Sequence, residues 1–437
     1  MEGPQRLLSA LEEHDESPLY GPVDTTSMRH RSREVEQSAG DLVGTALAPS
    51  FWGLVDSLAS LYPYRHQETD SCGRRSCTAA EPRIVCRKAR RPVRNDKLDL
   101  LRFVGLSMII LAHVGAPPWL WQLRNFDVPL LILVSGIALG LHQRSDSYLS
   151  YVSKRVERLL VPAWIFLSAY FLLLSTTGYP LPLPDARNIV RAYLLLTGVV
   201  NVWVIRVFVL IALIAPALVQ MNRQVRSHTR YLSLLGAMYL GYELVLFATK
   251  PYIDSPAGEI VESTVLYLIP YALVFAVGLR LPALPRNQVL RLTVGSFAVC
   301  SVVGVLLSAV SGHFVFTQEF KYPPALYYLS YALGVSGVLW LVADALMVTI
   351  TDSWLTKPMR FVAQNSLWIY LWHMPLVDMV HLPFYWKYPI VFAGASLVAF
   401  VQAQCVRQAL LPRISNASLR RNLKLVFTGS AVTHERN

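Results

Sequence analysis

The stretch LDLLRFVGLSMIILAH, residues 98–113, decides the fold class, because it opens a series of apolar runs. Each run has about the 20 residues that a helix needs to cross a bilayer. The chain of 437 residues is 54% hydrophobic and 16% charged, with a mean hydropathy of +0.39. This apolar share exceeds what a soluble globular surface tolerates. The sequence therefore predicts an all-α polytopic membrane protein and excludes a disordered one.

Working outward from residue 98, we expect about ten transmembrane helices between two polar ends. A poorly ordered cytoplasmic extension is expected over residues 1–97, a transmembrane domain over residues 98–411, and a basic cytoplasmic tail over residues 412–437. The expected helices cover residues 100–118, 126–142, 159–177, 202–219, 231–248, 265–279, 292–311, 326–350, 361–380 and 389–411.

The five cysteines show no paired, metal-like spacing, so we expect neither a disulfide framework nor a metal site. The polar extension before residue 98 lacks the order of charge, apolar core and cleavage site that marks a signal peptide. We interpret it as a flexible segment; a regulatory or partner-binding tail is the alternative.

The formal net charge of +12 fits either a nucleic-acid partner or membrane topology. If the N-terminus is cytoplasmic, every inside loop holds at least as many basic residues as its outside neighbours. The basic residues expected outside are Arg124, Arg187, Arg191, Lys250, Lys321 and Lys387. This alternation predicts that both termini are cytoplasmic, that the protein is a multi-pass protein of the inner (plasma) membrane, and that nucleic acid is not a partner.

The first two helices carry the strongest candidates for catalysis. His113 lies about as far before the middle of this hairpin as Asp127 lies after it, so antiparallel helices bring both to a similar depth. A neutral imidazole accepts a proton from a hydroxyl, while a carboxylate fixes its tautomer. We therefore predict His113 and Asp127 as catalytic residues, and we count Arg102 as a further functional candidate because a charged residue within a span is costly. The alternatives are a structural buried histidine for His113 and a helix N-cap for Asp127.

Arg155 and Arg158 stand at helical spacing at the inside end of the third helix. Two guanidinium groups on one face suit a phosphate-rich ligand, because their planar forks bind phosphate oxygens in a bidentate manner. Arg102 lies near the same membrane face. We predict that these three arginines bind a phosphate-rich ligand; anchoring by the positive-inside rule is the alternative for the pair.

Further polar side chains lie inside the expected helices. We count His373, Glu243 and Tyr331 as candidate substrate-binding residues. His373 is expected at about the depth of His113. Arg206 and Glu243 could instead neutralise one another. Gly136-x-x-x-Gly140 predicts close packing of the second helix.

Several segments together resemble the integral-membrane acyltransferase family 3, which includes bacterial O-acetyltransferases of cell-surface sugars. They are Arg102-x10-His113 within residues 98–113, FDVPLLILVSG (126–136), Arg155-x-x-Arg158 followed by LLVP, KYPPALYYLSYALG (321–334) and NSLWIYLWHMPL (365–376). The resemblance covers residues 97–411. The sequence VPLL after Asp127, in place of a bulkier aromatic pair, looks closer to the fucose-acetylase-like branch.

The resemblance implies a membrane-bound O-acyltransferase. By it, a cytoplasmic acyl-CoA, most often acetyl-CoA, donates its acyl group to a hydroxyl of a cell-envelope polysaccharide, glycolipid or related carbohydrate. His113 corresponds to the catalytic histidine, Arg102 to its partner arginine, and Arg155 and Arg158 to residues that engage the donor. The expected partners are acyl-CoA, this acceptor and membrane lipids.

Two other functions remain open from the residues alone. A transporter or flippase of a lipid-linked or small-molecule substrate commonly has paired interrupted helices in two halves, and we find no convincing repeat. A non-catalytic scaffold would leave Arg102, His113 and Asp127 as unexplained costs.

Overall fold

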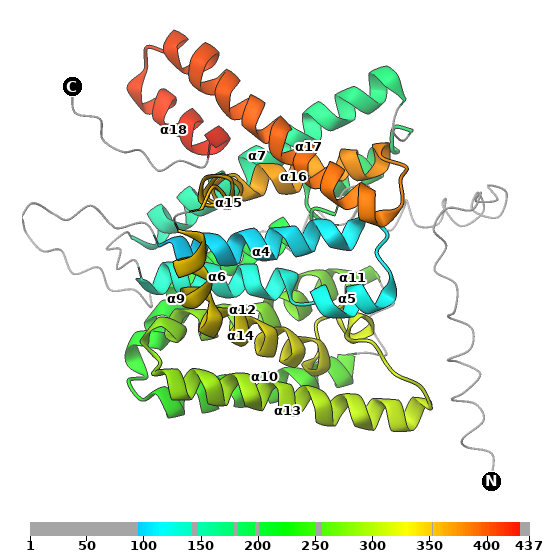
Figure 1. Ribbon diagram of the computed structural model, residues 1–437, viewed down its shortest axis with the longest axis vertical. Helices are drawn as coiled ribbons and strands as arrows, with labels where there is room; N and C mark the ends of the chain where they lie inside the picture. Colours follow the sequence, from blue (N-terminus) through cyan, green and yellow to red (C-terminus); the bar gives the residue numbers. More distant parts are fainter. Residues whose placement is uncertain are drawn as a thin grey trace, which may run out of the picture. The chain divides into compact units, whose positions relative to one another are not determined.

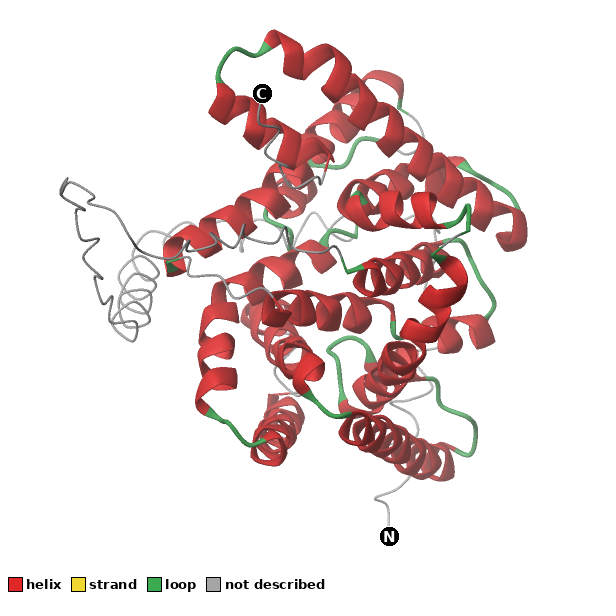
Figure 2. Ribbon diagram, turned by 60° about the vertical axis from the view of Figure 1, so that its left-hand side comes forward, coloured by secondary structure: helices red, strands yellow, loops and turns green. Residues whose placement is uncertain are grey.

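The computed structural model describes residues 95–141, 147–178, 182–196, 201–249, 256–351 and 353–428. Apart from one isolated β-bridge between Lys321 and Pro324, these ranges form helices and connecting loops (Figures 1 and 2). The helices, with η for 3-10 and π segments, are α4 (Asp96–His113), α5 (Pro118–Arg124), α6 (Asp127–Leu141), α7 (Tyr148–Thr177), α8 (Ala186–Tyr193), α9 (Trp203–Gln224), α10 (His228–Thr249), α11 (Pro256–Val261), η2 (Glu262–Leu266), α12 (Tyr267–Arg280), η3 (Leu281–Ala283), α13 (Arg286–Ser311), η4 (Thr317–Phe320), α14 (Leu326–Ile350), α15 (Thr356–Gln364), α16 (Ser366–Met379), α17 (Phe384–Cys405), η5 (Val406–Leu410), η6 (Leu411–Arg413) and α18 (Ala417–Thr428).

The helices confirm an all-α polytopic membrane protein. Among the described residues, eight helical stretches are long and apolar enough to cross a membrane. They are Pro118–Leu141, Tyr148–Thr177, Trp203–Gln224, His228–Thr249, Glu262–Ala283, Arg286–Ser311, Leu326–Ile350 and Phe384–Arg413.

Two further expected spans correspond to α4 and α16, which are helices but are not long and apolar enough to be counted among these eight. The 18 residues of α4 include four charged side chains in its first two turns, and α16 has only 14 residues because the helix is interrupted at Asn365. Both pack against other helices, α4 against α6 and α16 against α4 and α17. Protein contacts, rather than lipid, therefore surround much of these shorter and more polar helices.

The centre of the bundle is formed by α6 and α12, which pack closely through glycines. A Cβ on Gly136 would lie 2.2 Å from the Phe275 carbonyl oxygen, and one on Gly278 would lie 2.3 Å from that of Leu133. Gly140 approaches the Leu279 carbonyl in the same way. The close packing predicted from the Gly136-x-x-x-Gly140 pattern is confirmed, because only glycine lets these backbones meet.

The outer helices have the opposite character. Of an apolar stretch of 18 residues in each helix, only 6% is buried in α13 and 11% in α10, against 78% in the helix that contains α12. Val310 on α13 and Phe247 on α10 are almost wholly exposed. Apolar surface of this kind suits contact with lipid tails.

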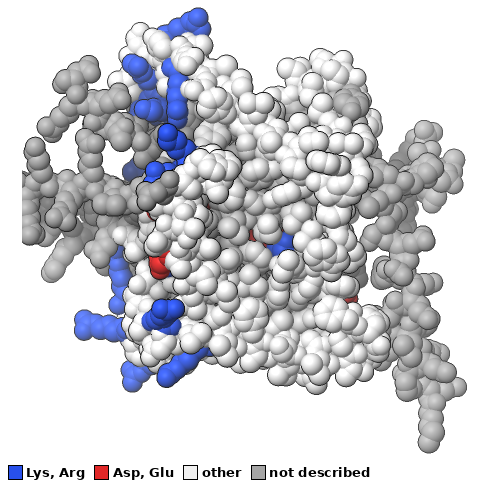
Figure 3. Space-filling model, in the orientation of Figure 1, with Lys and Arg blue, Asp and Glu red and all other residues white. Residues whose placement is uncertain are grey.

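Basic side chains gather at one end of the helices. Lys and Arg lie along the left-hand side of the molecule in Figure 3, which is the side where α4 begins in Figure 1. Arg360 on α15 binds Asp96 there, with Nε 2.7 Å from Oδ1 and Nη2 2.6 Å from Oδ2. The distribution fits the loops that we expected to be cytoplasmic.

The two polar ends of the chain differ in what can be described. The expected extension over residues 1–97 lies outside the described residues except for its last three, Asn95 to Lys97. Asn95 caps α4, because its side chain accepts a hydrogen bond from Leu98 N. The expected basic tail contains α18, which docks on the bundle: Trp368 Nε1 donates to Val426 O, and the Trp368 ring stacks on Phe427 at a centroid distance of 5.5 Å.

Candidate active site

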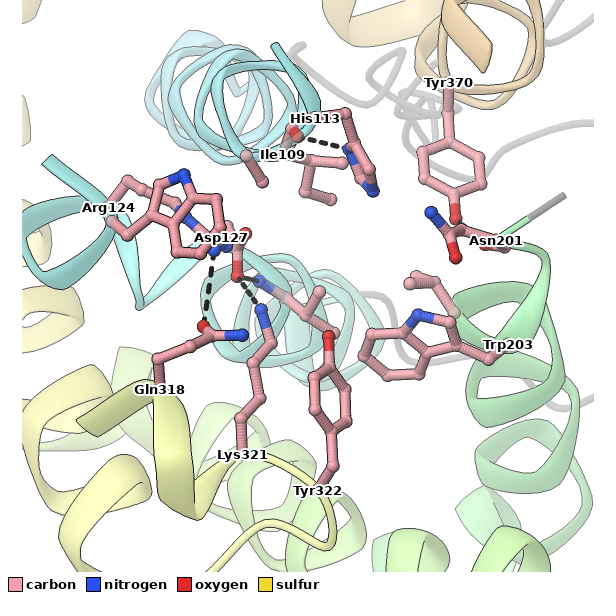
Figure 4. A pocket seen from close by; sticks show the side chains of 14 residues that line it. Ile109, His113, Arg124, Asp127, Asn201, Trp203, Gln318, Lys321, Tyr322 and Tyr370 are labelled. Carbon is pink, nitrogen blue, oxygen red and sulfur yellow. Dashed lines mark hydrogen bonds and ion pairs between the residues drawn. The ribbon is translucent and has the colours of Figure 1, made fainter. Parts of the chain in front are cut away.

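A cavity of about 180 Å³ lies where α4 ends and α6 begins, at the end opposite the basic side (Figures 1 and 4). It is lined from six parts of the chain: the end of α4, α5, the start of α6, the start of α9, the segment before α14, and α16. The lining residues are Ile109, Ala112, His113, Trp121, Arg124, Asp127, Val128, Asn201, Trp203, Val204, Gln318, Lys321, Tyr322 and Tyr370.

His113 is the last residue of α4 and lines this cavity. Its Nδ1 lies 2.8 Å from the carbonyl oxygen of Ile109, one helical turn earlier. A carbonyl oxygen only accepts hydrogen bonds, so Nδ1 carries the proton of the neutral ring and Nε2 is left with a free lone pair. The histidine is thus held in the tautomer in which Nε2 can accept a proton.

A second histidine lies directly behind the first. His373 on α16 is fully buried, and its Nδ1 donates to the carbonyl of Tyr370 in the preceding turn. Its Nε2 is therefore an acceptor, and it lies 3.4 Å from His113 Nδ1. The single proton on His113 Nδ1 accordingly faces two acceptors, the Ile109 carbonyl and His373 Nε2.

Asp127 begins α6 and lines the same cavity as His113, but its carboxylate is bound elsewhere. Arg124 Nη1 lies 2.7 Å from Oδ2, Val128 N donates to Oδ1 at 2.7 Å, and Lys321 Nζ lies 3.4 Å from Oδ1. Our expectation that Asp127 orients His113 is corrected by this geometry. The carboxylate organises two cations, while a carbonyl and a second imidazole orient His113.

The two cations that hold Asp127 are themselves buried. Only 4% of the Arg124 side chain and 3% of the Lys321 side chain is exposed. Arg124 Nη2 also donates to Gln318 Oε1 at 3.3 Å. Lys321 lies in the segment between η4 and α14, and burial lowers the pKa of its ammonium group to about 8, against the opposing effect of Asp127.

Aromatic side chains form the opposite wall. Trp203 at the start of α9 meets Tyr322 edge to face at a centroid distance of 5.5 Å, and Tyr370 donates its hydroxyl hydrogen to the carbonyl of Asn201. Trp121 of α5 completes the aromatic lining. Figure 4 shows Trp203 and Tyr370 across the cavity from Arg124 and Asp127. The site therefore joins a proton acceptor, a charged cluster and flat apolar surfaces.

A family model described as an acyltransferase domain matches residues 95–403, which includes every residue of this site. The chain belongs to acyltransferase family 3. It is thus a membrane acyltransferase that transfers groups other than aminoacyl groups. No curated protein and no solved structure matches the chain.

The residues expected to bind the donor lie away from the cavity lining of this acyltransferase. Arg102 is eleven residues before His113, about 16 Å along α4 at ~1.5 Å per residue, and its Nη1 lies 3.2 Å from Asp99 Oδ1. Arg155 lies in the first turns of α7, with its guanidinium carbon 5.7 Å from the centre of the Tyr151 ring, and Arg158 follows one turn later. All three lie towards the basic end of the acyltransferase.

All three candidate substrate-binding residues also lie outside the lining. His373 lies behind His113, which it contacts through Nε2. Tyr331 on α14 donates its hydroxyl hydrogen to Leu123 O at 2.9 Å, which ties α14 to α5. Glu243 lies on the peripheral helix α10. The expected alternative pairing of Glu243 with Arg206 is corrected as well, because Arg206 donates to the carbonyls of Leu195 and Leu196.

Sequence reasoning missed Arg124 and Lys321 as site residues of the acyltransferase, although both were counted in the topology. They are basic residues in segments expected on the outside, where the positive-inside rule disfavours them. An exception to that rule is a usable signal of function. It could not reveal that the two side chains, 197 positions apart, share one carboxylate.

Proposed function

We propose that this acyltransferase moves an acyl group, in the simplest case acetyl, from acyl-CoA to a hydroxyl of a cell-envelope carbohydrate or glycolipid, with His113 as general base. One observation carries the proposal: His113 lines a cavity while Ile109 and His373 hold its Nδ1 proton, so Nε2 is the basic atom. A base placed in this way suits removal of a proton from a neutral hydroxyl.

The proposed reaction is a single acyl transfer. The acceptor hydroxyl gives its proton to His113 Nε2 while its oxygen attacks the thioester carbonyl. The tetrahedral intermediate then collapses, the carbon–sulfur bond breaks, and the leaving thiolate takes the proton from His113. The products are an O-acyl ester and free CoA, and the histidine returns to its neutral form.

The partners of His113 support the charged state that forms during this cycle. Once Nε2 is protonated, the imidazolium carries its charge over both nitrogens. Its Nδ1–H still points at the Ile109 carbonyl and at His373 Nε2. Two neutral acceptors with fixed dipoles stabilise this cation and hold the ring in orientation.

The lining favours a sugar as acceptor. The apolar faces of a sugar ring pack well on flat aromatic side chains, while its hydroxyls need polar partners. Trp121, Trp203 and Tyr322 supply the aromatic surfaces. Asn201 and Gln318, in the same lining, supply polar groups. A cavity of about 180 Å³ is far larger than the ~10–15 Å³ that holds a single water, so it leaves room for a ligand such as a sugar unit.

The donor is proposed to enter from the basic end, which we take to be cytoplasmic in a bacterial inner membrane. Arg102, Arg155 and Arg158 lie towards that end and suit the phosphates of CoA. The thioester arm would then extend along α4 towards His113. Replacing Arg155 and Arg158 by Gln should mainly raise the donor KM, whereas the same change at the exposed Arg291 should not.

The test of the proposed function is product analysis. Membranes containing the chain are incubated with isotope-labelled acetyl-CoA and envelope glycans, and ester-linked label is measured by mass spectrometry. We expect labelled ester that depends on the chain and on His113. Movement of a glycan across the membrane with no acyl product would contradict the proposal and favour a transporter or flippase.

A further inference from the structure

The charged side chains that line the cavity do not balance. They are Arg124, Lys321 and Asp127, which gives two positive charges against one negative. All three side chains are at least 96% buried. The nearby Glu319 does not restore the balance inside the lining, because it is exposed and its Oε1 accepts a hydrogen bond from Phe316 N.

An unbalanced buried cation is costly unless a ligand or a further anion faces it. Lys321 is the cation with capacity to spare. An ammonium group has three N–H donors, and Nζ makes one ion pair, to Asp127 Oδ1 at the long distance of 3.4 Å. Arg124 holds Asp127 at the shorter distance of 2.7 Å through Nη1 and donates to Gln318 through Nη2, although its buried Nε has no partner. Lys321 has the weaker hold on the shared carboxylate, so we place the surplus charge at Lys321, on the cavity wall (Figure 4).

The position of this charge relates it to the acceptor rather than to the donor. Lys321 enters from the segment before α14, next to Tyr322 and beneath the cavity in Figure 4, whereas the arginines expected to engage the donor lie near the basic end of the bundle. Aromatic surface and surplus cation thus face one space. A ring with an apolar face and an acidic substituent satisfies both at once.

We propose that the acceptor is an acidic sugar, whose carboxylate or phosphate binds Lys321 while a neighbouring hydroxyl faces His113. The inference rests on the proposed function only in calling this ligand the acceptor; the preference for an anion follows from the charges of the cavity. Arg124 and Asp127 act together as the support that holds the ammonium group in place.

A competing role for the surplus charge is to stabilise the oxyanion that forms at the carbonyl oxygen of the thioester during attack. The two uses differ in what they predict. Removal of a side chain that stabilises the oxyanion lowers kcat equally for every acceptor and leaves acceptor binding unchanged. An anion-binding lysine discriminates between a charged and a neutral acceptor before any chemistry occurs.

The test is calorimetric titration of the purified full chain with three ligands: methyl glucoside, methyl glucuronoside and methyl glucoside 6-phosphate. We expect a Kd for at least one acidic glycoside that is tenfold or more below that of the neutral glycoside. The two acidic ligands separate a carboxylate-bearing from a phosphate-bearing acceptor. Equal values for all three, or no measurable binding of either acidic glycoside, would overturn the proposal.

Variants assign the preference to one side chain. Lys321→Met should bring the acidic and neutral Kd values together, and Lys321→Arg should keep them apart. Lys97→Met is the matched control, because Lys97, at the start of α4, also pairs with a carboxylate, that of Asp344. This variant should retain the full preference. A preference that persists in Lys321→Met would contradict the assignment. Binding is measured without donor, so a failure of acyl transfer would leave this result readable.

Discussion

His373 Nε2 lies 3.4 Å from His113 Nδ1, so the buried partner of the candidate base is a second imidazole and not a carboxylate. Both rings carry their proton on Nδ1, because each Nδ1 faces a main-chain carbonyl one turn earlier in its own helix. The pair therefore has a direction: His113 donates, His373 accepts. Two helices that are distant in sequence, α4 and α16, fix the orientation of the ring that we propose as the base.

Replacing His373 tests whether it positions His113. His373→Leu removes the second acceptor, and we expect kcat to fall by about 10- to 100-fold with both KM values nearly unchanged. The loss should be smaller than the ~10⁴ that follows loss of the carboxylate partner in a serine protease, because the Ile109 carbonyl remains. Steady-state kinetics provide the measurement.

The conservative variant separates positioning from packing. His373→Gln offers a carbonyl oxygen near the place of Nε2 and should recover much of kcat. If His373→Leu and His373→Gln were equally impaired while folded, or if KM rather than kcat changed, the positioning role would be wrong.

Asp127 is expected to matter for stability as much as for activity. Asp127→Asn leaves Arg124 and Lys321 buried without their shared anion, which costs about 3–5 kcal/mol. Asp344→Asn removes the 76% exposed partner of Lys97, for which the loss is about 0–1 kcal/mol. Thermal unfolding in detergent compares the two. A similar small shift for both variants would show that the buried cluster does not stabilise the fold.

Glycine packing between α6 and α12 gives a prediction about the fold. The Cβ of Gly136→Ala would meet the Phe275 carbonyl at 2.2 Å, so the helices must separate and the unfolding temperature should fall. Gly295→Ala on α13 meets nothing within 4 Å and should be neutral or stabilising by about 0.5–1 kcal/mol. An unchanged melting temperature for Gly136→Ala would contradict the close approach.

The ammonium group of Lys321 predicts a pH dependence of anion binding. Its pKa of about 8 means that Lys321 is charged at pH 7 and largely neutral at pH 9, so the preference for an acidic glycoside should weaken as pH rises through 8. The groups that face it are Asp127 on α6, Arg124 on α5, Tyr322 beside it, Tyr328 on α14 and His113 across the cavity. Lys321→Arg, whose guanidinium stays charged, should keep the preference at pH 9. A preference independent of pH in the native chain would refute the prediction.

The long apolar helices could be predicted from the sequence because each one corresponds to a local run of apolar residues. Every one of the ten expected apolar segments overlaps a helix, and the α14 boundaries, Leu326 and Ile350, agree to the residue. The interruption at Asn365 escaped prediction, since the apolar run continues through it. Local hydropathy reports where a helix lies, but not whether lipid or protein surrounds it.

The site could be predicted only in part. Hairpin geometry placed Asp127 at the depth of His113, and both line one cavity. Their expected contact did not form, because Arg124 and Lys321 compete for the carboxylate, and the latter reaches it from the segment before α14. Pairings between segments nearly 200 residues apart depend on tertiary packing, which no local pattern encodes.

The most direct test of the central claim, that His113 is the general base, is the single-turnover rate of acyl transfer from acetyl-CoA by His113→Gln. General-base catalysis contributes about 10²- to 10⁴-fold, so we predict a loss of that size in a variant that still folds and binds donor. His381→Gln, at an exposed histidine beyond the end of α16, is the control and should keep the native rate. A folded His113→Gln that transfers the acyl group at the native rate would contradict the account.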